Sequence, residues 1–401
     1  MRRGPLCGVR VVDLTTMFAG PLATRILADQ GADVVKVEAP GTGDLMRRMG
    51  IARGQIASTF HAVNRNKRSI VIDLRDARGR GVLEALVRGA DVFVQGFRPG
   101  VVERLGIDEP SLRRIASRLV YVSISAWGES GPYAKRPAFD SVVQAVAGYA
   151  ASQAGRDGVP RLVQNAITDK VTGLTAAQAI TAALFARERG AGGQHVRLAM
   201  LDAALDFLWV DVMQHRAFVG AEGTRRNTWP HVLSTRDGHV IASLINDAMF
   251  SGAVRAIGRP ELAQDARFAR VEDRLAHLEV LCDVLDATAA TFTTRELCER
   301  LERADVPHAA VTPLDEVETH PQVRANESLF EYDHPVSGRL RQARAAARFE
   351  ATPGGFRSPA PRLGEHADEI LAEIGFDADV RQSLQDEGIV GRPAGGLSAK
   401  H

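Results

Sequence analysis

The first 130 residues alternate short runs rich in Val and Ile with helical stretches, and this alternation limits the fold more than any other feature. Strands are predicted at residues 9–14, 33–37, 69–74, 91–95 and 119–125, with helices at 20–30 and 78–88. Strands that alternate with helices are typical of an α/β domain with a mostly parallel, Rossmann-like sheet. Such sheets bind ligands beyond the carboxyl ends of their strands. We therefore expect a ligand at loops 15–20, 38–44, 96–100 and 126–133.

At 401 residues the chain is long enough for more than one domain. Residues 220–230 are polar and rich in turn formers, a hairpin pattern follows around 236–238, and a further helix is predicted at 365–374. We expect a large Rossmann-like domain at 1–200 that is completed by 330–390, a linker at 201–225, a smaller α+β domain at 226–320, a returning linker at 321–335 and a flexible tail at 391–401.

Composition excludes several classes of protein. Fifty basic and forty-nine acidic residues leave a formal charge of +1, which argues against nucleic-acid or anionic-membrane binding. Cys7, Cys282 and Cys298 lack the spacing of a disulfide framework or a zinc site. No apolar run is long enough to span a membrane, and the N-terminus lacks the apolar segment of a signal peptide. We expect a cytoplasmic protein with no bound metal.

Three catalytic patterns are missing. Loop Thr15–Gly20 is not G-x-G-x-x-G, which disfavours an NAD-dependent dehydrogenase. The segment Ser123–Gly128 lacks the G-x-S-x-G of a nucleophile elbow. The histidines are scattered without metal-ligand spacing, so each is interpreted as a core or surface residue.

Basic side chains gather near the expected ligand edge. Arg and Lys at strand ends suit phosphate recognition. Each single residue is better explained as a solvated surface charge, but together they favour a phosphate-bearing ligand: a nucleotide, a sugar phosphate or coenzyme A. The segment Gly96–Gly100 follows a strand and combines glycines with Phe97 and Arg98, so it is either a nucleotide-binding loop or an ordinary turn. The basic set consists of Arg47, Arg48, Arg53, Lys67, Arg68, Arg75, Arg98, Arg104, Lys135 and Arg136.

Asp169 stands at the head of an alanine-rich helix predicted at residues 170–188 and ended by Gly190. Its carboxylate has two interpretations. It is either an N-cap or first-turn acid, or a nucleophile that the positive end of the helix keeps ionised at neutral pH.

The sequence resembles the family III CoA-transferases, of the formyl-CoA and carnitine CoA-transferase types, over roughly residues 4 to 375. Several segments carry the resemblance in one register: 8–14 (Gly-Val-Arg-Val-Val-Asp-Leu), 19–21 (Ala-Gly-Pro), 31–38, 66–70 (Asn-Lys-Arg-Ser-Ile), 136–140 (Arg-Pro-Ala-Phe-Asp), 194–203 and 359–366 (Pro-Ala-Pro-Arg-Leu-Gly-Glu-His).

This resemblance implies that Asp169 attacks an acyl-CoA thioester, and that transfer passes through aspartyl anhydride and aspartyl-CoA thioester intermediates. It also implies that the large domain binds CoA, with coenzyme A or acyl-CoA as a substrate, no permanently bound cofactor, and an interlocked homodimer. The implied CoA contacts are Phe18, Ala19, Ile72, Arg75, Gly96, Phe97, Arg98, Arg104, Arg136 and Phe139.

The sequence also departs from its relatives. Formyl-CoA transferases carry Gln where this chain has Phe18, and a glycine-rich loop where it has residues 243–248, which argues against oxalate and formate as substrates. Asn246 is a candidate replacement contact, and Asp140 either meets the substrate or caps the following helix. The acid pocket is expected near Thr16, Phe18, Trp229 and loop 243–250.

We therefore expect a CoA-transferase that acts on an acyl-CoA and a carboxylic acid. The related α-methylacyl-CoA racemases carry a G-H-D pattern where this chain reads Ala138-Phe139-Asp140, so the racemase alternative lacks a catalytic base. A CoA-binding protein without turnover is the other alternative.

Overall fold

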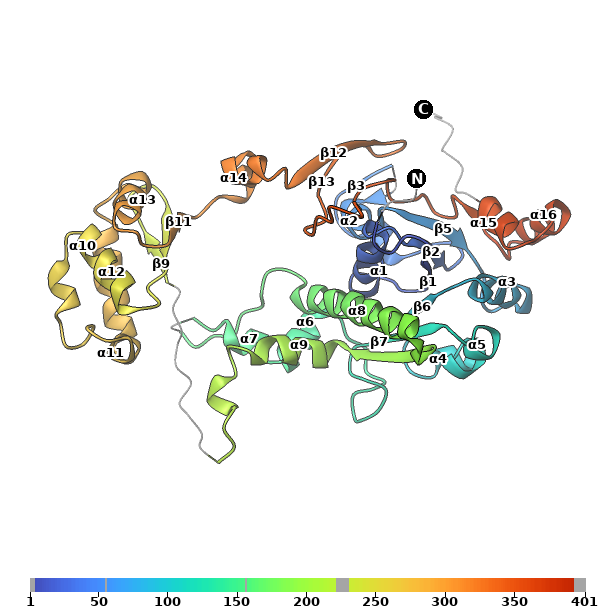
Figure 1. The fold of residues 1–401 in the computed structure, drawn as a ribbon, viewed down its shortest axis with the longest axis horizontal. Helices are drawn as coiled ribbons and strands as arrows, with labels where there is room; N and C mark the ends of the chain where they lie inside the picture. Colours follow the sequence, from blue (N-terminus) through green and yellow to red (C-terminus); the bar gives the residue numbers. More distant parts are fainter. Residues whose placement is uncertain (1–3, 55, 156, 221–230, 393–401) are drawn as a thin grey trace. The chain divides into compact units, whose positions relative to one another are not determined.

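The computed structural model describes residues 4–54, 56–155, 157–220 and 231–392. The chain divides into two compact units (Figure 1). The larger unit comprises Met1–Val212 and Ser328–His401, and the smaller unit comprises Met213–Glu327. Of the predicted tail, only Gly391 and Arg392 are described, and Trp229 lies outside the described residues.

A six-stranded parallel sheet forms the centre of the larger unit. The strand order is β5-β2-β1-β6-β7-β8, so the order reverses between β1 and β6. Val12 of β1 lies opposite Val35 of β2 on one side and Phe93 of β6 on the other. The predicted strands are confirmed, except that the one expected at 69–74 begins and ends earlier. The bounds are β1 Arg10–Asp13, β2 Asp33–Glu38, β5 Lys67–Val71, β6 Val92–Gln95 and β7 Val120–Ser125, and β8 Gln194–Ala199 completes the sheet.

Helices cover both faces of this sheet, because alternate strand residues point to opposite sides. On one face Val11, Val34 and Val122 pack with the apolar side chains of α1 and α8. On the other face Val12, Phe93 and Tyr121 pack with α3, α5, α15 and α16. The bounds are α1 Ala19–Asp29, α3 Ala77–Arg88, α4 Val101–Leu105, α5 Glu109–Ile115, α6 Asp140–Val146, α7 Tyr149–Ser152, α8 Ile167–Ala186, α9 Met200–Trp209, α15 Ala367–Glu373 and α16 Ala378–Asp386.

Helices α1 and α8 approach each other closely at Gly173. A Cβ atom there would lie 2.8 Å from the carbonyl oxygen of Ala19, a distance that no real side chain tolerates. Glycine therefore lets the first turns of α8 pack against the start of α1. This contact brings Asp169 to the carboxyl edge of the sheet.

Shorter elements complete the larger unit. The hairpin β12 Leu329–His334 and β13 Gly338–Ala343 is antiparallel, and the strand predicted near 340–349 ends earlier than expected because residues 344–349 are not extended. The remaining elements are the 3₁₀ turn η1 Leu45–Arg47, β3 Ala52–Arg53, β4 Ile56–Ala57 and α2 Ser58–Asn64. Helix α9 occupies part of the segment predicted as a linker.

The smaller unit has its own core of buried residues around Phe250, Phe268 and Leu285. A three-stranded antiparallel sheet, in the order β11-β10-β9, packs with helices, and the predicted hairpin is found in it. The bounds are β9 Val232–Ser234, β10 His239–Ala242, α10 Asp247–Ala256, α11 Val271–Ala276, α12 Leu278–Ala289, α13 Thr294–Arg303, β11 His308–Ala310 and α14 Pro321–Ala325.

Candidate functional site

A cavity of about 280 Å³ opens at the carboxyl edge of the sheet, where the loops after β1 and β6 meet. This is the point at which the strand order reverses, and such points are where open α/β sheets bind ligands. The lining residues are Thr15, Thr16, Met17, Ala19, Gly20, Gly96, Phe97, Arg98, Pro99, Ile124, Ser125, Ala126, Ala134, Arg136, Pro137, Ala138, Phe139, Asp169 and Met200.

The loop after β1 forms one wall of the cavity. Met17 lies in the left-handed region at φ +66°, which costs a residue other than glycine about 1 kcal/mol or more. Its backbone N–H donates to the Asp44 carboxylate over 3.1 Å. Helix α1 then begins without a side-chain cap, and its first two residues, Ala19 and Gly20, line the cavity.

The loop after β6 forms a second wall. The Gln95 side-chain oxygen accepts from the Phe97 backbone N–H at 2.7 Å, which fixes the turn. Gly100 adopts φ +87° as α4 begins. Arg98 lines the cavity, and no described carboxylate pairs with its guanidinium. An unpaired guanidinium in a cavity wall suits an anionic ligand.

The segment before α6 forms a third wall. The Trp127 indole N–H donates to the Arg136 carbonyl at 3.1 Å, and the Arg136 guanidinium stacks over the Tyr133 ring at 3.9 Å. Arg136 pairs with no described carboxylate, so a second cation remains available to an anion. Phe139 is exposed and lines the same cavity.

Asp169 lies in the first turn of α8, but it does not cap the helix. That role belongs to Asp140, whose Oδ1 accepts from the Thr168 N–H at 2.8 Å, the Thr168 hydroxyl at 2.7 Å and the Asp169 N–H at 3.2 Å. The Asp140 Oδ2 accepts from the buried Gln144 amide at 2.6 Å. The Asp169 carboxylate accepts no hydrogen bond from the described residues and opens into the cavity.

Burial raises the pKa of Asp169 to about 7, and the nearby Asp140 carboxylate acts in the same direction. The start of the helix therefore does not lower the pKa of Asp169 as the sequence interpretation expects, and at neutral pH the carboxyl is only partly ionised. The positive end of α8 is already occupied by Asp140, so Asp169 meets a like charge and poor solvation.

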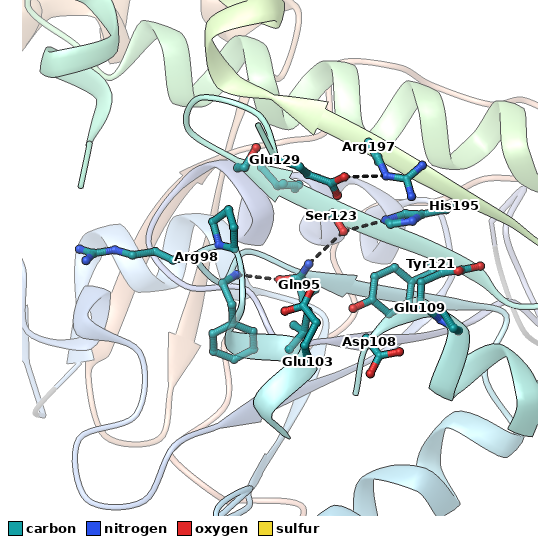
Figure 2. Close-up of a pocket in the computed structure, with 16 residues that line it drawn as sticks. Gln95, Arg98, Glu103, Asp108, Glu109, Tyr121, Ser123, Glu129, His195 and Arg197 are labelled. Carbon is teal, nitrogen blue, oxygen red and sulfur yellow. Dashed lines mark hydrogen bonds and ion pairs between the residues drawn. The ribbon is translucent and has the colours of Figure 1, made fainter. Parts of the chain in front are cut away.

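A second cavity of about 250 Å³ adjoins the first and shares Phe97, Arg98 and Ser125 with it (Figure 2). The Gln95 amide donates to the Ser123 hydroxyl at 2.9 Å, and that oxygen lies 2.8 Å from the His195 Nε2. This chain connects the edge strand β8 with the loop after β6. His195 is therefore bonded within the sheet, and its interpretation as a core or surface residue stays a prediction.

The cavity brings together eight of the sequence-predicted residues: Thr16, Ala19, Gly96, Phe97, Arg98, Arg136, Phe139 and Asp169. Others lie apart from it. Ile72 is buried in the core beside Val390, Arg75 pairs with Asp73 at 2.7 Å, and Phe18 packs beside Met46 and Phe60. Arg104 is exposed on α4, and Asp140 is engaged by α8.

Asn246 belongs to the smaller unit, where its side-chain oxygen accepts from the Met249 N–H at 2.8 Å and caps α10. Several residues of the basic set are engaged in ion pairs. Arg47 is buried against Glu38, Lys67 against Asp13, and Arg68 bonds Asp33. Among the basic set, only the cations without a carboxylate partner remain candidates for binding phosphate.

Sequence reasoning did not single out Met200, which lines the cavity just after β8. The signal was weak because β8 reads Gln194-His195-Val196-Arg197, a polar edge strand without a continuous apolar run. Among the described residues no cluster of three His, Cys, Asp or Glu is arranged to hold a metal ion. None of the described helices is both long and apolar enough to cross a membrane.

Comparison with known proteins shows the family to which this chain is similar. Residues 6–367 match the family described as CoA-transferase family III. The succinate–glutarate CoA-transferase of Agrobacterium fabrum is 33% identical, over 93% of this chain and 96% of its own length. The acetyl-CoA:oxalate CoA-transferase of Acetobacter aceti is 35% identical, over 82% and 86%. A crystal structure of a CaiB/BaiF family protein from Brucella suis is 33% identical, with a TM-score of 0.81 over 93% of this chain and 100% of that one.

Proposed function

The chain belongs to CoA-transferase family III, and from this membership we propose that it moves CoA from an acyl-CoA to a carboxylic acid with Asp169 as the covalent nucleophile. The observation that carries the proposal is the Asp169 carboxylate, which opens into the cavity and accepts no hydrogen bond from the described residues. A carboxylate without donors keeps its lone pairs available for attack.

The transfer proceeds by two symmetric exchanges. An Asp169 oxygen attacks the thioester carbonyl of the donor, the C–S bond breaks, and an aspartyl–acyl anhydride and CoA thiolate form. The thiolate then attacks the Asp169 carbonyl, releasing the donor acid and leaving an aspartyl-CoA thioester. The acceptor carboxylate repeats these steps in reverse, which returns Asp169 and yields the new acyl-CoA. No proton is gained or lost, so the site requires no general base.

CoA enters this mechanism as a substrate and not as a resident cofactor. Arg98 and Arg136 supply two cations without described carboxylate partners in the cavity wall, which supports binding of a polyphosphate such as the CoA pyrophosphate. A Cβ at Gly96 would lie 3.8 Å from its nearest neighbour, so packing within the protein does not require glycine there. Its absence leaves the backbone of this cavity-lining residue open to a ligand. The uncapped start of α1 offers further N–H donors to developing negative charge.

Trapping the covalent intermediates tests the proposal. The protein is incubated with acyl-CoAs and an acid panel that includes succinate, glutarate and oxalate, and hydroxylamine is then added. Mass spectrometry is expected to find a hydroxamate on the peptide that contains Asp169. Asp202 is a matched control, because it is also a first-turn acid but is exposed in α9 and outside the cavity. A hydroxamate at Asp202, or full transfer by Asp169→Asn, would overturn the assignment.

Two further measurements, solvent deuterium exchange and CoA binding, separate the alternatives. A racemase would exchange the α-proton of an acyl-CoA with solvent deuterium, and Phe139 offers no group for this where racemases carry a His. A binding protein without turnover would bind CoA yet give neither exchange nor adduct.

We also propose that the chain forms an interlocked homodimer. Large apolar side chains remain exposed on two helices of the larger unit, including Leu174 and Phe185 on α8 and Phe207 on α9. Exposed apolar surface of this kind supports a protein partner. Sedimentation over decreasing concentration is expected to retain a dimer, and a folded monomer would contradict the proposal.

A further inference from the structure

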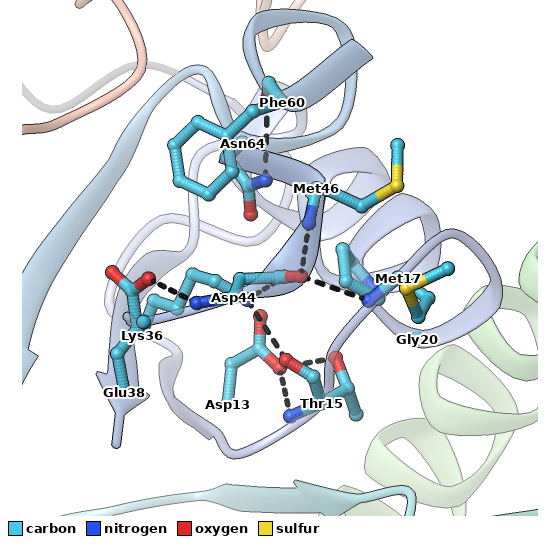
Figure 3. Close-up of polar contacts among 12 residues, drawn as sticks. Asp13, Thr15, Met17, Gly20, Lys36, Glu38, Asp44, Met46, Phe60 and Asn64 are labelled. Carbon is cyan, nitrogen blue, oxygen red and sulfur yellow. Dashed lines mark hydrogen bonds and ion pairs between the residues drawn. The ribbon is translucent and has the colours of Figure 1, made fainter. Parts of the chain in front are cut away.

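Four charged side chains are fully buried beneath the loop after β1. Figure 3 shows three of them, Asp13, Lys36 and Asp44. We call this group the buried ion cluster, and it consists of Asp13, Lys36, Asp44 and Lys67. Lys36 pairs with Asp44 at 2.9 Å, and Lys67 pairs with Asp13 at 3.1 Å. The cluster lies outside the cavity, since none of its members lines it.

The buried ion cluster contacts the loop and the start of α1 at several backbone atoms. Asp13 accepts from the Thr15 N–H at 2.9 Å, and the Lys36 ammonium donates to the Thr15 carbonyl at 2.8 Å. Asp44 accepts from the Met17 N–H at 3.1 Å. Lys67 donates to the Pro21 carbonyl at 2.9 Å. This stretch of backbone is therefore held from below at three residues, while its other side lines the cavity.

Stability alone is a poor explanation for such a cluster. Charges that are removed from water carry a desolvation penalty, and apolar residues of similar size often stabilise a fold equally well. What apolar residues could not supply is the Asp44 acceptor for Met17, the residue held at positive φ. Strained backbone persists only where its surroundings determine it, and it gathers at functional sites.

We propose that Asp44 and Lys36 are positioning residues of the transfer site. Asp44 holds Met17 in its left-handed conformation, and Lys36 fixes both the Asp44 carboxylate and the Thr15 carbonyl. Together they set the wall formed by Thr15–Gly20 and the uncapped start of α1 that shares the cavity with Asp169. This inference rests on the proposed transferase function, and neither residue touches the reacting atoms.

A double-mutant cycle between Asp44→Ala and Met17→Gly tests the proposal. Glycine adopts positive φ without strain, so a glycine at position 17 does not need the hydrogen bond to Asp44. In the protein that keeps Met17, Asp44→Ala is expected to lower kcat/KM about 100-fold, because a misplacement of about 1 Å costs that much. In the Met17→Gly variant the same change is expected to cost about tenfold or less. Equal losses of kcat/KM in both backgrounds would overturn the inference, because the effect of a merely structural Asp44 does not depend on which residue stands at position 17.

Hydrogen exchange of the peptide that covers residues 15–20 gives a readout independent of turnover. Asp44→Ala is expected to speed exchange there, whereas Asp377→Ala, which removes the N-cap of α16, should change neither this peptide nor kcat/KM. Unchanged exchange at 15–20 in Asp44→Ala would also overturn the inference. If the wild-type protein showed no acyl transfer, the proposed function would be refuted instead. Hydrogen exchange at residues 15–20 would still test whether Asp44 holds this loop.

Discussion

Asp13 and Asp169 are both largely removed from water in the larger unit, yet their surroundings differ completely. Asp13 accepts four hydrogen bonds, from the N–H and hydroxyl of Thr15, the Thr24 hydroxyl and the Lys67 ammonium. Although burial acts to raise it, the charges of Lys67 and Lys36 hold the pKa of Asp13 well below its ordinary value. Asp169 accepts none from the described residues, and its pKa is raised to about 7.

The difference shows that burial does not by itself decide what a carboxylate does. With cations and donors around it, a buried carboxylate stays ionised and holds the groups that bond to it. Without them it costs stability and remains reactive. This contrast distinguishes the buried ion cluster, which contacts the loop after β1, from Asp169, the carboxylate proposed to react.

Replacing Asp169 should produce the largest effect. Asp169→Asn keeps the shape but removes the nucleophile, so transfer is expected to fall by at least about 1,000-fold. Stability at pH 8 should rise by roughly 2 kcal/mol, because a carboxyl whose folded pKa is raised destabilises the fold once it ionises. Rate assays and thermal unfolding check both outcomes. If Asp169→Asn lost stability as well as activity, Asp169 would be a structural acid like Asp13.

Replacing Asp13 should change stability in the opposite direction. Asp13→Ala leaves the buried Lys67 without its carboxylate and is expected to destabilise the protein by about 3–5 kcal/mol. Denaturant unfolding measures the change. Asp157→Ala removes an exposed carboxylate paired with Arg161 and should cost less than about 1 kcal/mol. Similar losses in both variants would remove the contrast between the two regions.

The pH dependence of transfer should follow Asp169. Its carboxyl is protonated below a pKa of about 7 and ionised above it. Because the ionised form attacks, kcat/KM is expected to rise about tenfold per pH unit up to neutrality and then to level off. A rate profile from pH 5 to pH 9 checks this sign. A rate that is flat down to pH 5 would show that Asp169 is ionised as Asp13 is.

The smallest expected effect concerns Asp140. Asp140→Asn keeps an oxygen for the Thr168 N–H but removes the negative charge that helps to raise the pKa of Asp169. The midpoint of the rate profile is therefore expected to move to lower pH, by less than about one unit, since burial is the larger cause. A midpoint that moves to higher pH would contradict this electrostatic role.

Much of the sheet followed from local pattern. Residues 33–38 and 120–125 are short runs rich in Val and Ile, and both form interior strands of the sheet as predicted. Strand β8 did not follow, because an edge strand with polar residues lacks that pattern. Local pattern singled out Asp169, Phe97 and Arg98, the family resemblance gave them roles, and the structure brings them into one cavity.

The interpretation of Lys67 shows where local pattern fails. From the sequence it was one cation among several at the ligand edge, whereas the structure buries it against Asp13, 54 residues earlier. The two interpretations of Asp169 also remained open until Asp140, from another helix, was found to cap α8. In each case the deciding partner is distant in sequence.

By itself, then, the amino-acid order determined most of the segments that become strands and helices in the sheet, since hydrophobic period and turn residues act over a few neighbours. It also determined the family, because the matching segments extend along most of the chain. Only the tertiary structure decided which charges are buried in pairs and which carboxylate is left without donors. Burial and pKa depend on groups that approach through space, and no local pattern encodes those approaches.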